Sequence, residues 1–155
     1  MIDPSPSVSD VQQQRNLRFS KSFSSAQPVR SGLTISSHAL LLEIDLRIAY
    51  CAGAWLSVIV LSQAAIEAQE RQVTQGNYKA NAKELFSADP DLKWLRGLRN
   101  ELVHAAEPGT PSQVWKVPAT DFGLAQQSLE GEATRALEVM FRTIYGRRNP
   151  SGSAT

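Results

Sequence analysis

The segment Ile48–Ile66 constrains the fold most, because it is a run of nineteen residues that are mostly apolar. It belongs to a longer helical pattern, which runs from Ser36 or Ser37 to about Gln75. Gly76 then ends the pattern. A helix of nearly forty residues with an apolar middle needs neighbours on most of its sides. The sequence therefore predicts a bundle built around one long central helix.

A membrane span is the alternative interpretation of this segment, since nineteen residues are close to the length that crosses a bilayer. Polar residues dilute the run, however, and the charged residues Asp45, Arg47 and Glu67 lie at its ends. We therefore expect a buried helix and no membrane contact. The N-terminus lacks a charged region followed by an apolar one, so we predict no secretion signal and a cytoplasmic location.

The composition limits which kinds of ligand site and cross-link the chain can form. A chain of 155 residues fits one domain, and a net charge of +1 does not indicate a nucleic-acid-binding protein, although a balanced total still allows a local basic groove. Cys51 is the only cysteine, and His38 and His104 are the only histidines. The sequence therefore predicts no internal disulfide and no thiolate or multi-histidine metal site within one chain. We expect no metal and no other cofactor.

The two ends of the chain lack a sustained period of apolar residues. Residues 1–33 are mostly Ser, Gln, Pro and Arg with scattered apolar side chains, and Val11–Phe23 has only a marginal helical pattern. We predict a flexible N-terminal arm over 1–33, with contact between its basic residues and RNA as an alternative to simple solvation. Residues 147–155 are predicted to be a disordered C-terminal tail.

Residues 34–146 carry helical patterns and no convincing strand pattern. Besides the long helix and a helix near residue 90, the predicted elements are a short helix over Asn77–Ser87, a loop over Pro108–Thr120, and an amphipathic last helix from Asp121 or Ser128 to Tyr145. Together they define an all-α fold, an antiparallel helical bundle of four to five helices.

The helix near residue 90 is well marked at both ends. Asp89 can cap it and Pro90 suits its first position, while the prolines and glycine of 107–111 end it near His104. On a projection of 100° per residue, Arg99 falls inside the arc of apolar side chains. We therefore expect its guanidinium to be partly desolvated.

A polar strip borders this apolar arc and contains Arg96, Asn100 and His104. A partly buried cation such as Arg99 needs an anion, because an unpaired buried charge is costly. A carboxylate of Glu67 or Glu43 on the long helix would give Arg99 a structural role. A phosphate would give it a functional one, and the sequence leaves both alternatives open.

The residues Arg99–His104 read Arg-Asn-Glu-Leu-Val-His, which resembles the R-x4-6-H motif of HEPN domains (higher eukaryotes and prokaryotes nucleotide-binding), where a polar residue often follows the arginine. The similarity extends over about Ser36 to Tyr145, with the long apolar helix ahead of the motif. It implies a helical bundle that forms a homodimer, in which two motifs face one cleft. Many members are metal-independent endoribonucleases, and many are toxins or antiviral effectors, so the partners implied are RNA, a second copy and an antitoxin.

The resemblance also assigns roles to the candidate site residues. Arg99 would clamp phosphate oxygens, Asn100 would orient the phosphate or the imidazole, and His104 would act as acid or base. Some toxins extend the motif with a tyrosine that an antitoxin nucleotidyltransferase modifies. Ala106 occupies that position here, so this mode of control is not implied. The alternative function is a non-catalytic helical module that binds RNA, a nucleotide or a partner protein.

Overall fold

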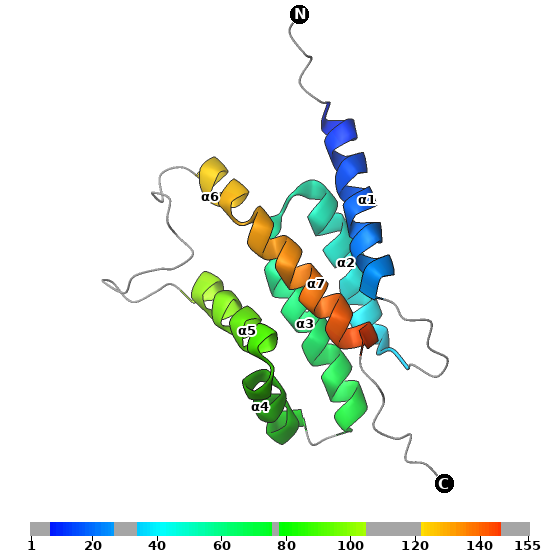
Figure 1. Cartoon of the computed structure of the whole chain (residues 1–155), viewed down its shortest axis with the longest axis vertical. Helices are drawn as coiled ribbons and strands as arrows, with labels where there is room; N and C mark the ends of the chain where they lie inside the picture. The colour runs from blue at the N-terminus through cyan, green and yellow to red at the C-terminus, as the bar shows by residue number, and fades with distance from the viewer. Residues whose placement is uncertain (1–6, 27–33, 76–77, 105–121, 147–155) are drawn as a thin grey trace, which may run out of the picture.

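The computed structural model describes residues 7–26, 34–75, 78–104 and 122–146. These residues form helices and no strand, which confirms the predicted all-α bundle (Figure 1). The helices are α1 (Val8–Ala26), α2 (Ser37–Ala52), α3 (Trp55–Thr74), α4 (Tyr78–Ala88), α5 (Pro90–Val103), α6 (Phe122–Ser128) and α7 (Glu130–Gly146).

Helix α3 is the centre of the bundle, since it packs against α2, α4, α5, α6 and α7. Helix α1 lies along α2 and α7, while α5 contacts α3, α4 and α7 (Figure 1). The core consists of aliphatic and aromatic side chains with almost no exposed surface, among them Leu46, Ile59, Ile66, Leu92, Leu95, Leu137, Met140 and Phe141. Burial of these side chains is the main favourable contribution to folding.

The predicted single long helix is wrong, because the chain reverses direction at Gly53. This glycine has a φ of 74°, in the left-handed region that is easy only for glycine. Its N–H donates to the carbonyl of Tyr50 at 3.1 Å, and the N–H of Ala54 donates to the carbonyl of Ala49 at 2.9 Å. These two bonds form the Schellman motif that ends many helices. As a result α2 and α3 run antiparallel, side by side (Figure 1).

This reversal also divides the apolar run Ile48–Ile66 between α2 and α3. Within the described ranges, no helix combines the length and the apolar character that crossing a bilayer requires. With α1, this division and the separation of α6 from α7, the described residues form seven helices, whereas the sequence predicted four to five.

We expect Gly53→Ala to lower the free energy of unfolding by about 1–2 kcal/mol, because an L residue is strained at this positive φ. The new Cβ would also approach the Arg15 guanidinium, which can move aside. Gly97→Ala is the matched control, since Gly97 lies inside α5 with open space around it. That change should stabilise the protein by about 0.5–1 kcal/mol. Denaturant unfolding measures both, and equal effects would contradict the assignment of the turn.

The flexible-arm prediction is wrong for residues 8–26, which form α1 and join the bundle. Phe19 is 3% exposed, and its ring meets the rings of Tyr50 and Phe141 edge to face, with centroids 5.9 and 5.3 Å away. Arg15 donates to the carbonyl of Cys51 at 3.3 Å and lies 4.9 Å from the centre of the Trp55 ring. Helix α1 is therefore attached both to the core and to the α2–α3 turn.

Two further predicted helices can be compared with the structure, whereas the predicted loop and tail cannot. The short helix predicted over Asn77–Ser87 is present as α4. The predicted last helix is present as two helices, α6 and α7, which follow each other closely. Residues 1–6 and 27–33 of the predicted arm, the loop over Pro108–Thr120 and the tail over 147–155 lie outside the described residues.

Candidate functional site

Helix α5 places the candidate site residues, and its own sequence fixes where it begins. The carboxylate of Asp89 accepts hydrogen bonds from the N–H groups of Asp91 at 2.8 Å and Leu92 at 3.2 Å. Pro90 occupies the first turn, as predicted. The leucines of the helix, Leu92, Leu95 and Leu98, are buried in the core. One side of α5 is thus packed against the core through these leucines.

Two arginines from α7 fasten the start of α5. Arg135 donates to the Asp91 carboxylate at 3.0 Å and lies 4.0 Å from the centre of the Trp94 ring, and Arg142 bonds the other oxygen of Asp91. These hydrogen bonds lower the pKa of Asp91. The opposite end of the helix, which carries the motif, is thereby positioned on a fixed scaffold.

The motif lies in the last turns of α5. Arg99 is half-buried, in agreement with the helical projection, and its Nη1 donates to Oδ1 of Asn100 at 3.0 Å. Asn100 and His104 are exposed. His104 ends the helix with an extended backbone, and its N–H donates to the carbonyl of Asn100 at 2.9 Å. One chain therefore brings Arg99 and Asn100 into contact at the surface.

The two carboxylates that could have given Arg99 a structural role have other partners. Glu43 accepts a hydrogen bond from the Tyr145 hydroxyl at 2.5 Å, and burial raises the pKa of this carboxyl. Glu67 accepts from the Gln63 amide at 2.8 Å. Other arginines of the described helices, Arg18, Arg135 and Arg142, do form ion pairs. Within the described residues, the guanidinium of Arg99 instead donates to a neutral amide, that of Asn100.

Guanidinium has five N–H donors, and among the described residues the Asn100 amide accepts from one of them. The planar fork of Arg99 therefore has the geometry to bind an anion such as phosphate as well. Among the described residues, the His104 side chain makes no hydrogen bond with Arg99 or Asn100. One chain therefore supplies one guanidinium that can hold a phosphate and one exposed imidazole, and these two side chains are not hydrogen-bonded to each other. No cluster of three or more metal-ligating side chains occurs within the described ranges.

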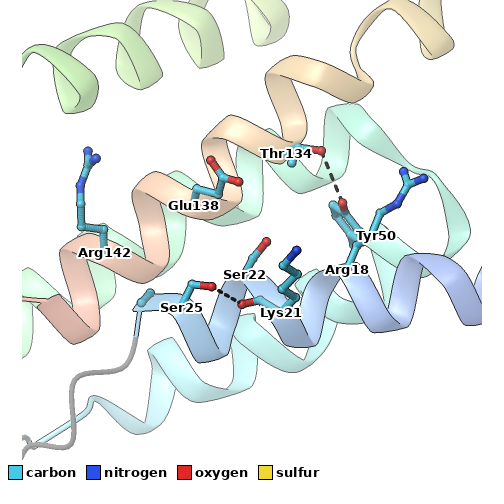
Figure 2. Close-up of a pocket in the computed structure, with 9 residues that line it drawn as sticks. Arg18, Lys21, Ser22, Ser25, Tyr50, Thr134, Glu138 and Arg142 are labelled. Carbon is cyan, nitrogen blue, oxygen red and sulfur yellow. Dashed lines mark hydrogen bonds between the residues drawn. The ribbon is translucent and has the colours of Figure 1, made fainter.

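A cavity of about 480 Å³ between α1 and α7 was not predicted from the sequence (Figure 2). At its base the hydroxyls of Tyr50 and Thr134 lie 3.4 Å apart, and Lys21 and Glu138 line its sides. The other two cations of the lining have carboxylate partners: Arg18 pairs with Glu130, and Arg142 with Asp91. The cavity therefore has little net positive charge. It was missed because the sequence analysis assigned α1 to a flexible arm.

Comparisons of this chain with protein-family models, with curated proteins and with solved structures find no match. The local geometry thus decides between the two candidate sites. The end of α5 presents a guanidinium, an amide and an exposed imidazole, which are groups that recognise and act on phosphodiesters. The cavity between α1 and α7 offers balanced charges and no imidazole among its lining residues. The end of α5 is the stronger candidate.

Proposed function

We propose that this protein is a metal-independent endoribonuclease of HEPN type that acts as a homodimer. The observation that supports the proposal best is the state of Arg99. Arg99 is half-buried at the surface end of α5, and within the described residues its guanidinium donates to the Asn100 amide in a solvent-exposed hydrogen bond. A guanidinium held there by a neutral amide can bind an external anion, because its planar fork matches the geometry of phosphate oxygens.

RNA cleavage without a metal needs three contributions, and the motif residues can supply them. A base removes the proton of the 2′-OH, the 2′-oxygen attacks phosphorus, and the bond to the 5′-oxygen breaks while an acid protonates that oxygen. Positive charge on the phosphate stabilises the transition state. In the proposed reaction His104 transfers protons, Arg99 holds the phosphate, and Asn100 fixes the orientation of the Arg99 guanidinium.

The proposed reaction explains why two chains are needed. One base and one acid act in the same step, and one chain carries a single histidine in this motif. A two-fold pairing of α5 ends would bring two copies of His104 and Arg99 to one cleft. A toxin or defence effector, kept inactive by an antitoxin partner, is the cellular role that this proposal includes.

The test is cleavage of a panel of structured and single-stranded RNAs by the purified full chain in EDTA. We expect products with a 2′,3′-cyclic phosphate and a 5′-hydroxyl, and no cleavage of the matching DNA or 2′-O-methyl RNA, which lack the attacking hydroxyl. If no RNA is cleaved, the nuclease proposal is wrong. Salt-dependent RNA binding that is weakened by Arg99→Ala would then favour the alternative, a non-catalytic binding module.

A further inference from the structure

The cavity between α1 and α7 is lined by a cation and an anion that are not paired with each other. Lys21 lies on the α1 side of the cavity, and Glu138 lies on the α7 side (Figure 2). Within the described residues neither side chain forms an ion pair, whereas the two arginines of the lining, Arg18 and Arg142, do. A ligand in this cavity would therefore meet one positive and one negative group.

The α7 side and the base of the cavity carry hydrogen-bond acceptors. The Thr134 hydroxyl donates to the carbonyl of Glu130 at 2.9 Å, so it is the acceptor in its contact with the Tyr50 hydroxyl. Each of these two oxygens keeps a lone pair for a further donor. Thr134 lies one helical turn before Glu138, on the same face of α7. With the Glu138 carboxylate they make three acceptors, which matches the three N–H donors of a primary ammonium group.

The α1 side carries hydrogen-bond donors. The Lys21 ammonium has three donors and no acceptor. Ser22 follows it and is half-buried, and within the described residues its hydroxyl makes no hydrogen bond. Figure 2 shows both side chains extending from α1 toward α7. This side therefore suits a carboxylate, which only accepts hydrogen bonds.

We propose that this cavity binds a small zwitterion with a primary ammonium and a carboxylate, as in an amino acid or a dipeptide. The ammonium binds Glu138, Thr134 and Tyr50, and the carboxylate binds Lys21 and Ser22. The cavity volume of about 480 Å³ lies within the range of about 300–1,000 Å³ that is usual for small-molecule sites. A simple anion would be repelled by Glu138, and a simple cation by Lys21, so both charges are needed for recognition.

This site is separate from the proposed nuclease site and does not depend on the nuclease proposal. The residues that line the cavity lie on α1, α2 and α7, whereas Arg99 and Asn100 lie on α5. Absence of RNA cleavage would therefore leave the binding proposal unchanged, and absence of ligand binding would leave the nuclease proposal unchanged.

The test is a titration of the purified full chain, followed by the backbone amide signals in NMR. The probes are L-alanine, γ-aminobutyric acid and glycylglycine, whose two charges are increasingly far apart. We expect saturable shifts at Ser22 and Glu138 with at least one probe. The matched ligand controls are the N-acetyl and the carboxamide derivatives of that probe, each of which lacks one charge. Both should bind about tenfold more weakly, because each loses hydrogen bonds between charged groups.

Variants of the lining test the same contacts from the protein side. Glu138→Gln and Lys21→Gln should each weaken binding of the zwitterion by about tenfold, and Tyr50→Phe by about fivefold. Lys93→Gln on α5 and Glu84→Gln on α4 are the matched controls, because both side chains are exposed and neither lines the cavity. These controls should bind as the wild type does. Lys21 and Glu138 are exposed, so their variants should keep the fold, which circular dichroism checks.

Three results would overturn the proposal. The first is the absence of shifts with every probe at about 10 mM, where a ligand with a millimolar Kd is mostly bound. The second is equal binding of the derivatives that lack one charge, a result that needs only the wild-type chain. The third is unchanged binding in both Lys21→Gln and Glu138→Gln.

Discussion

The variant His104→Ala is expected to lower the rate of RNA cleavage by about 10²–10⁴-fold, the usual contribution of a general acid or base. The fold should be unaffected, because His104 is exposed and its side chain makes no hydrogen bond within the described part of the chain. Initial rates on one cleaved RNA, together with the thermal midpoint of each variant, measure both effects. Lys93→Ala is the matched control, since Lys93 is an exposed cation on the same helix. Full activity in His104→Ala would contradict the assignment.

Arg99→Ala should reduce cleavage by about 10²–10³-fold, comparable to the loss of one donor that stabilises the transition state. The Arg99→Lys variant tests whether the site needs only a positive charge or also the planar guanidinium group. Lysine keeps the positive charge but cannot form the planar fork that holds both Asn100 and a phosphate, so we expect only partial recovery. Full recovery would mean that the site needs a point charge alone.

Mixing wild-type chains with His104→Ala chains tests whether two chains share one site. If each cleft needs both imidazoles, activity falls with the square of the wild-type fraction, so that an equal mixture has about a quarter of the full activity. If each chain acts alone, the same mixture has half. The chains must be unfolded and refolded together, because a stable dimer does not exchange its partners quickly. A linear dependence would contradict the shared cleft.

The second large effect is expected from Phe19→Ala, which should lower the free energy of unfolding by about 3–5 kcal/mol. Phe19 is almost fully buried and contacts the rings of Tyr50 and Phe141, so its removal leaves a cavity and ends two aromatic contacts. Leu17→Ala is the matched control on the same helix, because Leu17 is 64% exposed. It should change stability by less than about 0.5 kcal/mol. Similar small effects in both variants would mean that α1 is not part of the folded bundle.

Local signals explain why some elements were predicted correctly. Asp89 and Pro90 determine the start of α5 through contacts with their immediate neighbours, and the structure shows those hydrogen bonds. The half-burial of Arg99 also follows from the helical repeat alone. Both features depend on residues within a few positions of each other, so they can be seen in the sequence.

Features that depend on distant contacts were not predictable in the same way. The sequence on both sides of Gly53 favours helix, and a glycine can either continue a helix or end it. The packing of α2 on α3 favours the reversal. Phe19 and Phe23 are the two aromatic residues of a polar segment, and the rings that Phe19 contacts lie more than thirty residues away in the sequence. The contact between Arg99 and Asn100 was also unexpected, since Asn100 was assigned to orient the phosphate or the imidazole.

The docking of α1 has a consequence for the order in which the bundle is completed. Arg15 binds the turn between α2 and α3, and Phe19 packs on Phe141 of α7. Helix α1 is therefore synthesised before α7 but has no complete docking surface until α7 has been synthesised too. Because α1 packs on both α2 and α7, a truncation within α7 should weaken the docking of α1, although the two helices are far apart in the sequence.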